Sequence, residues 1–423
     1  MALSVELILA IILGISLAAS LASRRTRIPY TMFLVFIGIG VAATSNPTLS
    51  PLYDTFTAML GGGVFVGIIL PPLLFESTMS ISAREFRAVS RPALVLATGG
   101  VVLATVLVGF ILLRVTDLPP FAAFLFAALI APTDVATVLE IFRRTMVPGK
   151  LATMMEAESI FNDATGVALL TVILTSFEAS TSGAVFLDAA AKFILVFGGG
   201  IVVGLGFALL ASQLQRATQD PISQVVLTMT AVYGSYGLAS AIGVSGLIAV
   251  AVTGLLYGNT VLLRIQNNPA DQATRQFWGI LAFLANTVAF LFIGLSTNII
   301  SLAGSLGLIL IAYGVVLLSR FATVYSILSI PRIAQFAVPW SWKNVTMFGG
   351  MRGALSIALV ASLPVSLTGY STIVNMTFGV AVFSILLQGP LLTTYSRRAF
   401  AQGQEMETIG TGTPGAGEET GST

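Results

Sequence analysis

The chain consists largely of apolar runs of roughly twenty residues, separated by short polar segments. A helix of about twenty residues is long enough to cross the hydrocarbon core of a bilayer, which is about 30 Å thick. Inside that core a helix satisfies its own backbone hydrogen bonds, and no water is needed to do so. The sequence therefore predicts an all-α polytopic membrane protein.

Windows of about twenty apolar residues predict roughly thirteen spans. The predicted spans cover residues 4–22, 29–45, 57–76, 92–115, 119–142, 151–177, 184–211, 222–242, 244–260, 276–297, 302–330, 338–363 and 370–396. The 20 Lys and Arg residues test this count, because basic residues are retained in cytoplasmic loops. With the N-terminus outside, sixteen of them fall in alternate, cytoplasmic segments, and only Arg114 and Lys192 lie near outside ends. We therefore expect the N-terminus outside and the C-terminus in the cytoplasm, and the lean loops favour a bacterial inner (plasma) membrane.

The composition narrows the chemistry. The chain has no His, which excludes imidazole-bound zinc, a Ser-His hydrolase and a His proton relay. It has no Cys, which excludes disulfides and thiolate metal sites. The basic residues are spread over many loops, so we expect no nucleic acid partner. Carboxylates remain as the groups that exchange protons, and we expect neither a cofactor nor an enzymatic activity.

Residues 1–400 form the predicted membrane domain. Beyond them the composition shifts to Gly, Thr, Ser and Glu without Lys or Arg. Such a segment buries too little apolar surface to order itself, so residues 401–423 are predicted to be a disordered cytoplasmic tail.

Two predicted spans are interrupted at similar places in the two halves of the chain. The fifth contains Pro132, which removes a backbone donor and clashes with the preceding turn, and the twelfth contains Gly349, Gly350 and Gly353. Interrupted helices in matching halves are typical of inverted-repeat transporters, whose unwound backbone lines a cavity. We expect spans 1–6 and 8–13 to form the two repeats.

The sixth predicted span carries polar residues at membrane depth. Glu158 and Asn162 are four residues apart, as are Ser159 and Asp163, so we expect all four on one helical face. Hydroxyl, amide and carboxylate oxygens suit a dehydrated alkali cation such as Na⁺. Thr133, next to Asp134 in the interrupted fifth span, would add further oxygens.

The number of charged residues at membrane depth also points to a site for cations or protons. Four carboxylates and two arginines lie at predicted membrane depth: Glu76, Asp134, Glu158, Asp163, Arg320 and Arg352. An uncompensated charge at the centre of a span costs about 3 kcal/mol. Two arginines cannot neutralise four carboxylates, so the cluster must take up protons or cations. Competition between the two is antiport in outline.

Four motifs, in this order along the chain, resemble those of the sodium/proton antiporters of the cation:proton antiporter superfamily. They are Pro132-Thr133-Asp134, Glu158-Ser159-x-x-Asn162-Asp163, Ser319-Arg320, and the run from Gly349 to Ala354. Asn162 before Asp163 is similar to the Asn-Asp subgroup, which includes NhaP-type bacterial antiporters and animal sodium/proton exchangers. The resemblance covers nearly the whole chain.

The resemblance implies an NhaA-like antiporter fold and a homodimer that works by elevator-like alternating access in cellular pH homeostasis. Spans 1–3 and 7–10 would form the interface part, and spans 4–6 and 11–13 the ion-binding core with two crossing discontinuous helices. Exchange of one Na⁺, or of one Li⁺ or K⁺ in its place, for one H⁺ would be electroneutral. Asp163 would bind either the cation or the proton, and Ser159, Thr133, Asp134 and Glu76 would contribute to the site.

The remaining motif residues would be structural. The resemblance implies that Glu158 pairs with Arg320 and that Asn162 holds the crossing region by hydrogen bonds, and we expect a structural role for Arg352. The proline that usually follows the aspartate in the fifth span is Val135 here, so the geometry around Asp134 depends on Pro132 alone.

Three alternatives stay open from the sequence. A potassium/proton antiporter of the same fold would use the same oxygen donors. An intramembrane aspartyl protease would activate water between Asp134 and Asp163, but the chain lacks a Gly-x-Gly-Asp segment. A channel is disfavoured, because carboxylates beside arginines at interrupted helices fit stoichiometric exchange better than a continuous pore.

Overall fold

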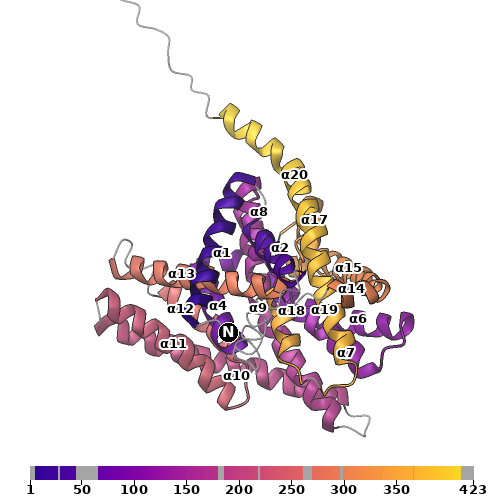
Figure 1. The fold of residues 1–423 in the computed structure, drawn as a ribbon. Helices are drawn as coiled ribbons and strands as arrows, with labels where there is room; N and C mark the ends of the chain where they lie inside the picture. The colour runs from indigo at the N-terminus through magenta and orange to yellow at the C-terminus, as the bar shows by residue number, and fades with distance from the viewer. Residues whose placement is uncertain are drawn as a thin grey trace, which may run out of the picture.

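The computed structural model describes residues 5–26, 29–43, 65–179, 185–217, 220–260, 269–295, 299–334, 336–364 and 366–410. These residues form helices and no strand, which confirms the all-α prediction. Figure 1 shows α11, α12 and α13 gathered on one side of the molecule and α6, α7, α15 and α19 on the other, with α9 between them.

The first half of the chain contains ten α-helices and two π-helical turns within the described residues. They are α1 (Val5–Thr26), α2 (Tyr30–Ala43), the π-turn η1 (Phe65–Ile69), α4 (Leu70–Ser80), α5 (Ala83–Val95), the π-turn η2 (Leu96–Gly100), α6 (Val101–Val115), α7 (Pro120–Ile130), α8 (Ala136–Thr145), α9 (Gly149–Ala179), α10 (Val185–Leu214) and, after a short 3₁₀ turn η3 (Gln215–Ala217), α11 (Pro221–Ala241).

The second half continues in the same way. Its elements are α12 (Gly246–Thr260), α13 (Pro269–Leu295), α14 (Ile299–Gly304), α15 (Leu306–Leu328), α16 (Pro331–Ala334), α17 (Trp340–Phe348), α18 (Ala354–Ala361), α19 (Tyr370–Phe383), the π-turn η4 (Ser384–Gln388) and α20 (Gly389–Gly410).

Helices occupy most of the described part of every predicted span. Six of these helices are long and apolar enough by themselves to cross a membrane: Ala83–Val115, Gly149–Thr175, Ala190–Ala217, Pro269–Leu295, Leu306–Leu328 and Tyr370–Phe400. Shorter apolar helices occupy Tyr30–Ala43, Val66–Ser80, Pro120–Ile130 and Gly246–Asn259. The number of thirteen crossings stays a prediction.

Several helix ends differ from the predicted span ends. The fourth span begins at Ala83 rather than at residue 92, because its first turns carry exposed arginines that an apolar window leaves out. At the C-terminal end, α20 continues to Gly410, so residues 401–410 are helical and the predicted boundary at 400 was too early. Gln, Glu and Met are good helix formers, which is consistent with this extension. Residues 411–423 of the predicted tail lie outside the described residues.

Helices α2 and α13 cross in close contact at two glycines. A methyl group at Gly38 would lie 2.6 Å from the Leu291 carbonyl oxygen and 2.7 Å from Cα of Gly294. Gly294 in turn has the backbone of α2 against it. Small residues allow spanning helices to approach backbone to backbone, which maximises packing contacts in a lipid environment. This crossing ties α2 to α13.

We predict that Gly38→Ala lowers the thermal unfolding midpoint in detergent, although Ala is the better helix former. The matched control is Gly40→Ala on the same helix, where no atom lies within 4 Å of the added methyl group. Gly40→Ala should leave the midpoint unchanged or raise it slightly, because Ala favours the helix over Gly by up to about 1 kcal/mol. Equal midpoints for the two variants would contradict the close crossing.

Candidate functional site

The fifth predicted span is divided into α7 and α8 by residues 131–135. The last carbonyl groups of a helix lack partners within the helix, and inside a membrane they need other donors. Here Arg352 supplies one, because its Nη1 donates to the carbonyl oxygens of Ala131 and Pro132, the latter at 2.9 Å. Arg352 is only 3% exposed. Its guanidinium therefore supports the broken end of α7 and does not pair with a carboxylate in the described part of the chain.

The twelfth predicted span is divided into α17 and α18 by residues 349–353, and the two breaks touch each other. The backbone N–H of Asp134 donates to the carbonyl oxygen of Met351 at 2.8 Å. Any side chain at Gly353 would collide with the Asp134 carboxylate. Glycine at 353 is thus required for the two unwound segments to meet.

Helix α9 holds this crossing from one side. Asn162 donates through Nδ2 to the Thr133 hydroxyl at 2.7 Å and accepts from the Thr133 N–H at 3.3 Å. Ser159 donates its hydroxyl to the Thr133 carbonyl oxygen at 2.8 Å. Ser159 keeps its oxygen lone pairs, which remain available to a cation. Thr133 has its hydroxyl and its carbonyl both engaged by α9.

Glu158 is occupied by an ion pair. Arg320 donates through Nη1 and Nη2 to the two carboxylate oxygens of Glu158, the second at 3.0 Å, and also to the Thr346 carbonyl oxygen at 3.1 Å. Glu158 is 1% exposed and Arg320 is 7% exposed. This is the pairing that the motif resemblance implied, and it ties α9 to α15 and α17.

The four polar residues of α9 occupy one broad sector of the helix, but only two of them line the cavity. Glu158 and Asn162 point into packed surroundings, whereas Ser159 and Asp163 line a cavity. Consecutive helix residues are separated by about 100°, so 158 with 162 and 159 with 163 form two stripes. Only the second stripe, which Glu156 and Ile160 extend, is available to an ion in the cavity.

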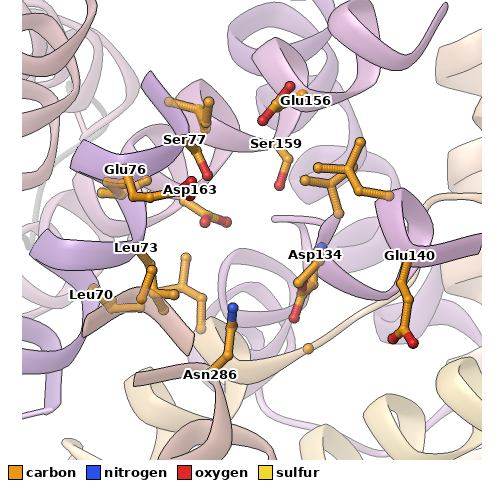
Figure 2. Close-up of a pocket in the computed structure, with 18 of the residues that line it drawn as sticks. Leu70, Leu73, Glu76, Ser77, Asp134, Glu140, Glu156, Ser159, Asp163 and Asn286 are labelled. Carbon is orange, nitrogen blue, oxygen red and sulfur yellow. The ribbon is translucent and has the colours of Figure 1, made fainter. Parts of the chain in front are cut away.

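A cavity of about 690 Å³ lies beside the crossing. One wall comes from the crossing and α9, with Thr133, Asp134, Ser159 and Asp163. The opposite wall comes from α4 and α13, with Glu76, Ser77, Phe283 and Asn286. Figure 2 shows Glu76, Asp134, Ser159 and Asp163 among the labelled side chains around this cavity. The structure thus brings together the five residues predicted to bind the ion.

The Asp163 carboxylate is open to this cavity. It is half-buried, and none of the described residues donates a hydrogen bond to it or forms an ion pair with it. Asp134 differs, because its Oδ1 accepts from the Ala136 N–H at 2.8 Å and it has further contacts.

The charges on the cavity wall favour cations. Its lining includes the acids Glu76, Asp134, Glu140, Glu156 and Asp163, and Arg143 is the one basic residue among the lining residues. Oxygen donors in such a field suit an alkali cation or a proton. The described residues contain no group of three or more His, Cys, Asp or Glu side chains placed to hold a resident metal ion.

Sequence reasoning left some lining residues out. Glu156 is not among the residues predicted to bind the ion, yet it lines the cavity. Its spacing of three and seven residues from Ser159 and Asp163 could have placed it on their face. Tyr30 and Asn286 also line the cavity, and no motif marks them, because they come from helices that tertiary packing brings to this wall.

Comparison with known proteins gives a consistent result. The sequence profile of the family described as "Sodium/hydrogen exchanger, transmembrane" matches residues 8–398. The Na(+)/H(+) antiporter ApNhaP of Aphanothece halophytica is 33% identical over 392 residues, which are 92% of this chain and 73% of that protein. The Na(+)/H(+) antiporter NhaG of Bacillus atrophaeus is 34% identical over 373 residues, which are 87% of this chain and 70% of that protein.

A solved structure has a similar fold. The sodium proton antiporter MjNhaP1 from Methanocaldococcus jannaschii superposes with a TM-score of 0.75 and 24% identity, covering 92% of this chain and 98% of that one. This likeness assigns the chain the same fold.

We predict that Arg320→Gln strongly destabilises the protein, because it strands the buried Glu158 charge at a cost of about 3–5 kcal/mol. The thermal unfolding midpoint in detergent would fall accordingly. The double variant Glu158→Gln with Arg320→Gln removes both charges and should recover part of the loss. A single variant as stable as the native protein, or a double variant less stable than both single ones, would contradict this role.

Proposed function

The chain belongs to the sodium/hydrogen exchanger family, and from that premise we propose that it is a secondary active Na⁺/H⁺ antiporter in which the cation and the proton compete for Asp163. The observation that carries the proposal is the open Asp163 carboxylate, which faces a cavity lined by further oxygen donors. Two of its relatives are named Na(+)/H(+) antiporters and are 33% and 34% identical to this chain over most of its length.

Asp163 suits this role because the neighbouring polar residues on α9 are bound to other side chains. Glu158 is neutralised by Arg320, and Asn162 is held by Thr133. A charged Asp163 without a cation would be costly in this setting, so either Na⁺ or H⁺ neutralises it. Na⁺ would find oxygen ligands in Asp163, Ser159 and Glu76, with Asp134 and the Thr133 region completing the site.

We infer one Na⁺ for each H⁺, because a single open carboxylate that exchanges one monovalent cation for one proton moves no net charge. The cavity includes Arg143, an exposed residue on a segment that we propose to be cytoplasmic, and this supports the proposal of an inward-open state. Transport then requires a second state in which this cavity is closed and the site opens to the outside.

The membrane arrangement and assembly are part of the same proposal. We propose a multi-pass protein of the bacterial inner membrane, with the N-terminus outside, acting in pH homeostasis as a homodimer. In that assembly the helices of spans 1–3 and 7–10 would form the interface part, and the crossing region would move with the ion-binding core.

The first test is exchange in liposomes that contain a trapped pH dye, with the membrane potential held at zero. We predict sodium-dependent proton movement that Asp163→Asn abolishes, because a side-chain amide does not take up or release a proton near neutral pH. Glu85→Gln, an exposed acid outside the cavity lining, is the matched control and should keep native flux. Equal flux in Asp163→Asn would reject the site.

Competition makes a separate prediction. As pH falls, the apparent KM for Na⁺ should rise by up to about tenfold per pH unit, the limit for one proton excluding one cation, while the maximal rate stays constant. A maximal rate that falls with an unchanged KM would contradict a shared carboxylate.

The same liposomes separate the alternatives. Flux with K⁺ but not with Na⁺ would favour the potassium/proton antiporter, and a rate that follows an imposed membrane potential would reject 1:1 exchange. Cleavage of a membrane peptide, lost in Asp134→Asn and Asp163→Asn, would favour the intramembrane protease.

A further inference from the structure

The Glu140 side chain on α8 forms hydrogen bonds with residues of two other helices, at the end of α1 and the start of α2. Its carboxylate oxygens accept from the backbone N–H of Tyr30 at 3.1 and 3.0 Å, and Oε1 accepts from the Ser23 hydroxyl at 3.0 Å. Tyr30 is the first residue of α2, so its N–H has no partner within that helix. A carboxylate there is also favoured by the helix dipole.

Two further contacts reinforce this junction. Arg144 donates through Nη2 to both Glu140 Oε1 and the Ser23 hydroxyl, each at 2.8 Å. One turn before Glu140, Thr137 shares a hydrogen bond of 2.9 Å with Thr31 of α2. Both threonine side chains and Ser23 are buried. The set of Ser23, Tyr30, Thr31, Thr137, Glu140 and Arg144 is called the junction below.

The junction connects the two walls of the cavity. Helix α8 continues from the break that carries Asp134, so it belongs with the crossing region and α9. Helix α2 is tied to α13 by the Gly38 and Gly294 crossing, and α13 supplies Phe283 and Asn286 to the opposite wall. Tyr30 and Glu140 themselves line the cavity, on the side where Arg143 is exposed.

We propose that Glu140 is a positioning residue whose contacts across this junction stabilise the inward-open state and must break when the cavity closes. The proposal rests on the proposed function in one respect, that the cavity opens alternately to the two sides. Closure requires the two walls to move relative to each other. Contacts within either wall survive such a movement, whereas hydrogen bonds from α8 to α1 and α2 join groups that separate. Hydrogen bonds to a charged group are the strong ones, so their loss shifts the balance between the states.

The chain contains no Cys, which makes the two states measurable without removing native thiols. Ser77→Cys places a single thiol on the cavity wall, where Figure 2 shows the Ser77 side chain beside Glu76. The readout is its rate of modification by a membrane-impermeant maleimide in inside-out vesicles, with the full-length protein. This rate follows the fraction of molecules that are open to the cytoplasm.

Three variants are compared in the Ser77→Cys background. Glu140→Ala removes the charged contacts, and Thr137→Val removes one neutral hydrogen bond across the junction. Thr145→Val is the matched control on the same helix, because the Thr145 hydroxyl donates to the Ile141 carbonyl oxygen of α8 itself. We expect Glu140→Ala to shift the ratio of the two states on the order of tenfold. If the inward-open state begins at about nine-tenths occupancy, a tenfold shift slows labelling about twofold, and a lower starting occupancy gives a larger slowing. Thr137→Val should slow labelling less, and Thr145→Val should not change it.

Native labelling rates in both Glu140→Ala and Thr137→Val would overturn the proposal, as would equal slowing in Thr145→Val, which would indicate general loosening of α8. If gel filtration shows that Glu140→Ala does not fold, the labelling rates of Thr137→Val and Thr145→Val are compared instead. The labelling readout needs no ion flux. Slower labelling in a protein without sodium-dependent flux would therefore reject the proposed function alone, and native labelling in an active antiporter would reject the junction alone.

Discussion

The structure depends on how unwound backbone is satisfied at the depth of a bilayer. Two predicted spans are interrupted, and each break leaves backbone N–H and C=O groups that lipid cannot hydrogen-bond. Arg352 donates to the carbonyl oxygens at the end of α7, and the Asp134 N–H donates to Met351 across the crossing. Gly353 allows the two segments to approach this closely. The position of every ion-binding candidate follows from this crossing, because Thr133 and Asp134 lie within it and α9 packs against it.

Around the crossing, several polar side chains are paired, whereas the Asp163 carboxylate is open to the cavity. Asn162 and Ser159 hold Thr133, and Arg320 neutralises Glu158. These contacts make the surroundings rigid and electrically balanced. Asp163 faces the cavity without such a partner among the described residues, so its charge is available for exchange. A carboxylate that is neutralised by an arginine, as Glu158 is, would not need Na⁺ or H⁺ to balance its charge.

The cavity also lies between two groups of helices, and this arrangement makes a static site suitable for transport. Asp163 and Ser159 come from one wall and Glu76 from the other. In the proposed mechanism, a relative movement of the walls would both change the ligand set and close access from one side. Hydrogen bonds that join the walls, such as those of Glu140 to Ser23 and Tyr30, then oppose this movement, whereas glycine crossings such as Gly38 with Gly294 hold each wall together.

The sequence by itself determined the all-α membrane fold and the two interruptions, because apolar run length, Pro132 and the glycines act locally. The resemblance of its motifs to a known family implied the pairing of Glu158 with Arg320, which the structure contains. Only the tertiary structure decided which polar residues of α9 line the cavity, because their spacing alone does not separate Ser159 and Asp163 from Glu158 and Asn162. Likewise, the role of Arg352 and the place of Glu156, Asn286 and Tyr30 in the cavity depend on packing between helices far apart in the chain. Long-range contacts of this kind leave no periodic signal, since each involves residues whose local neighbours are ordinary spanning helix.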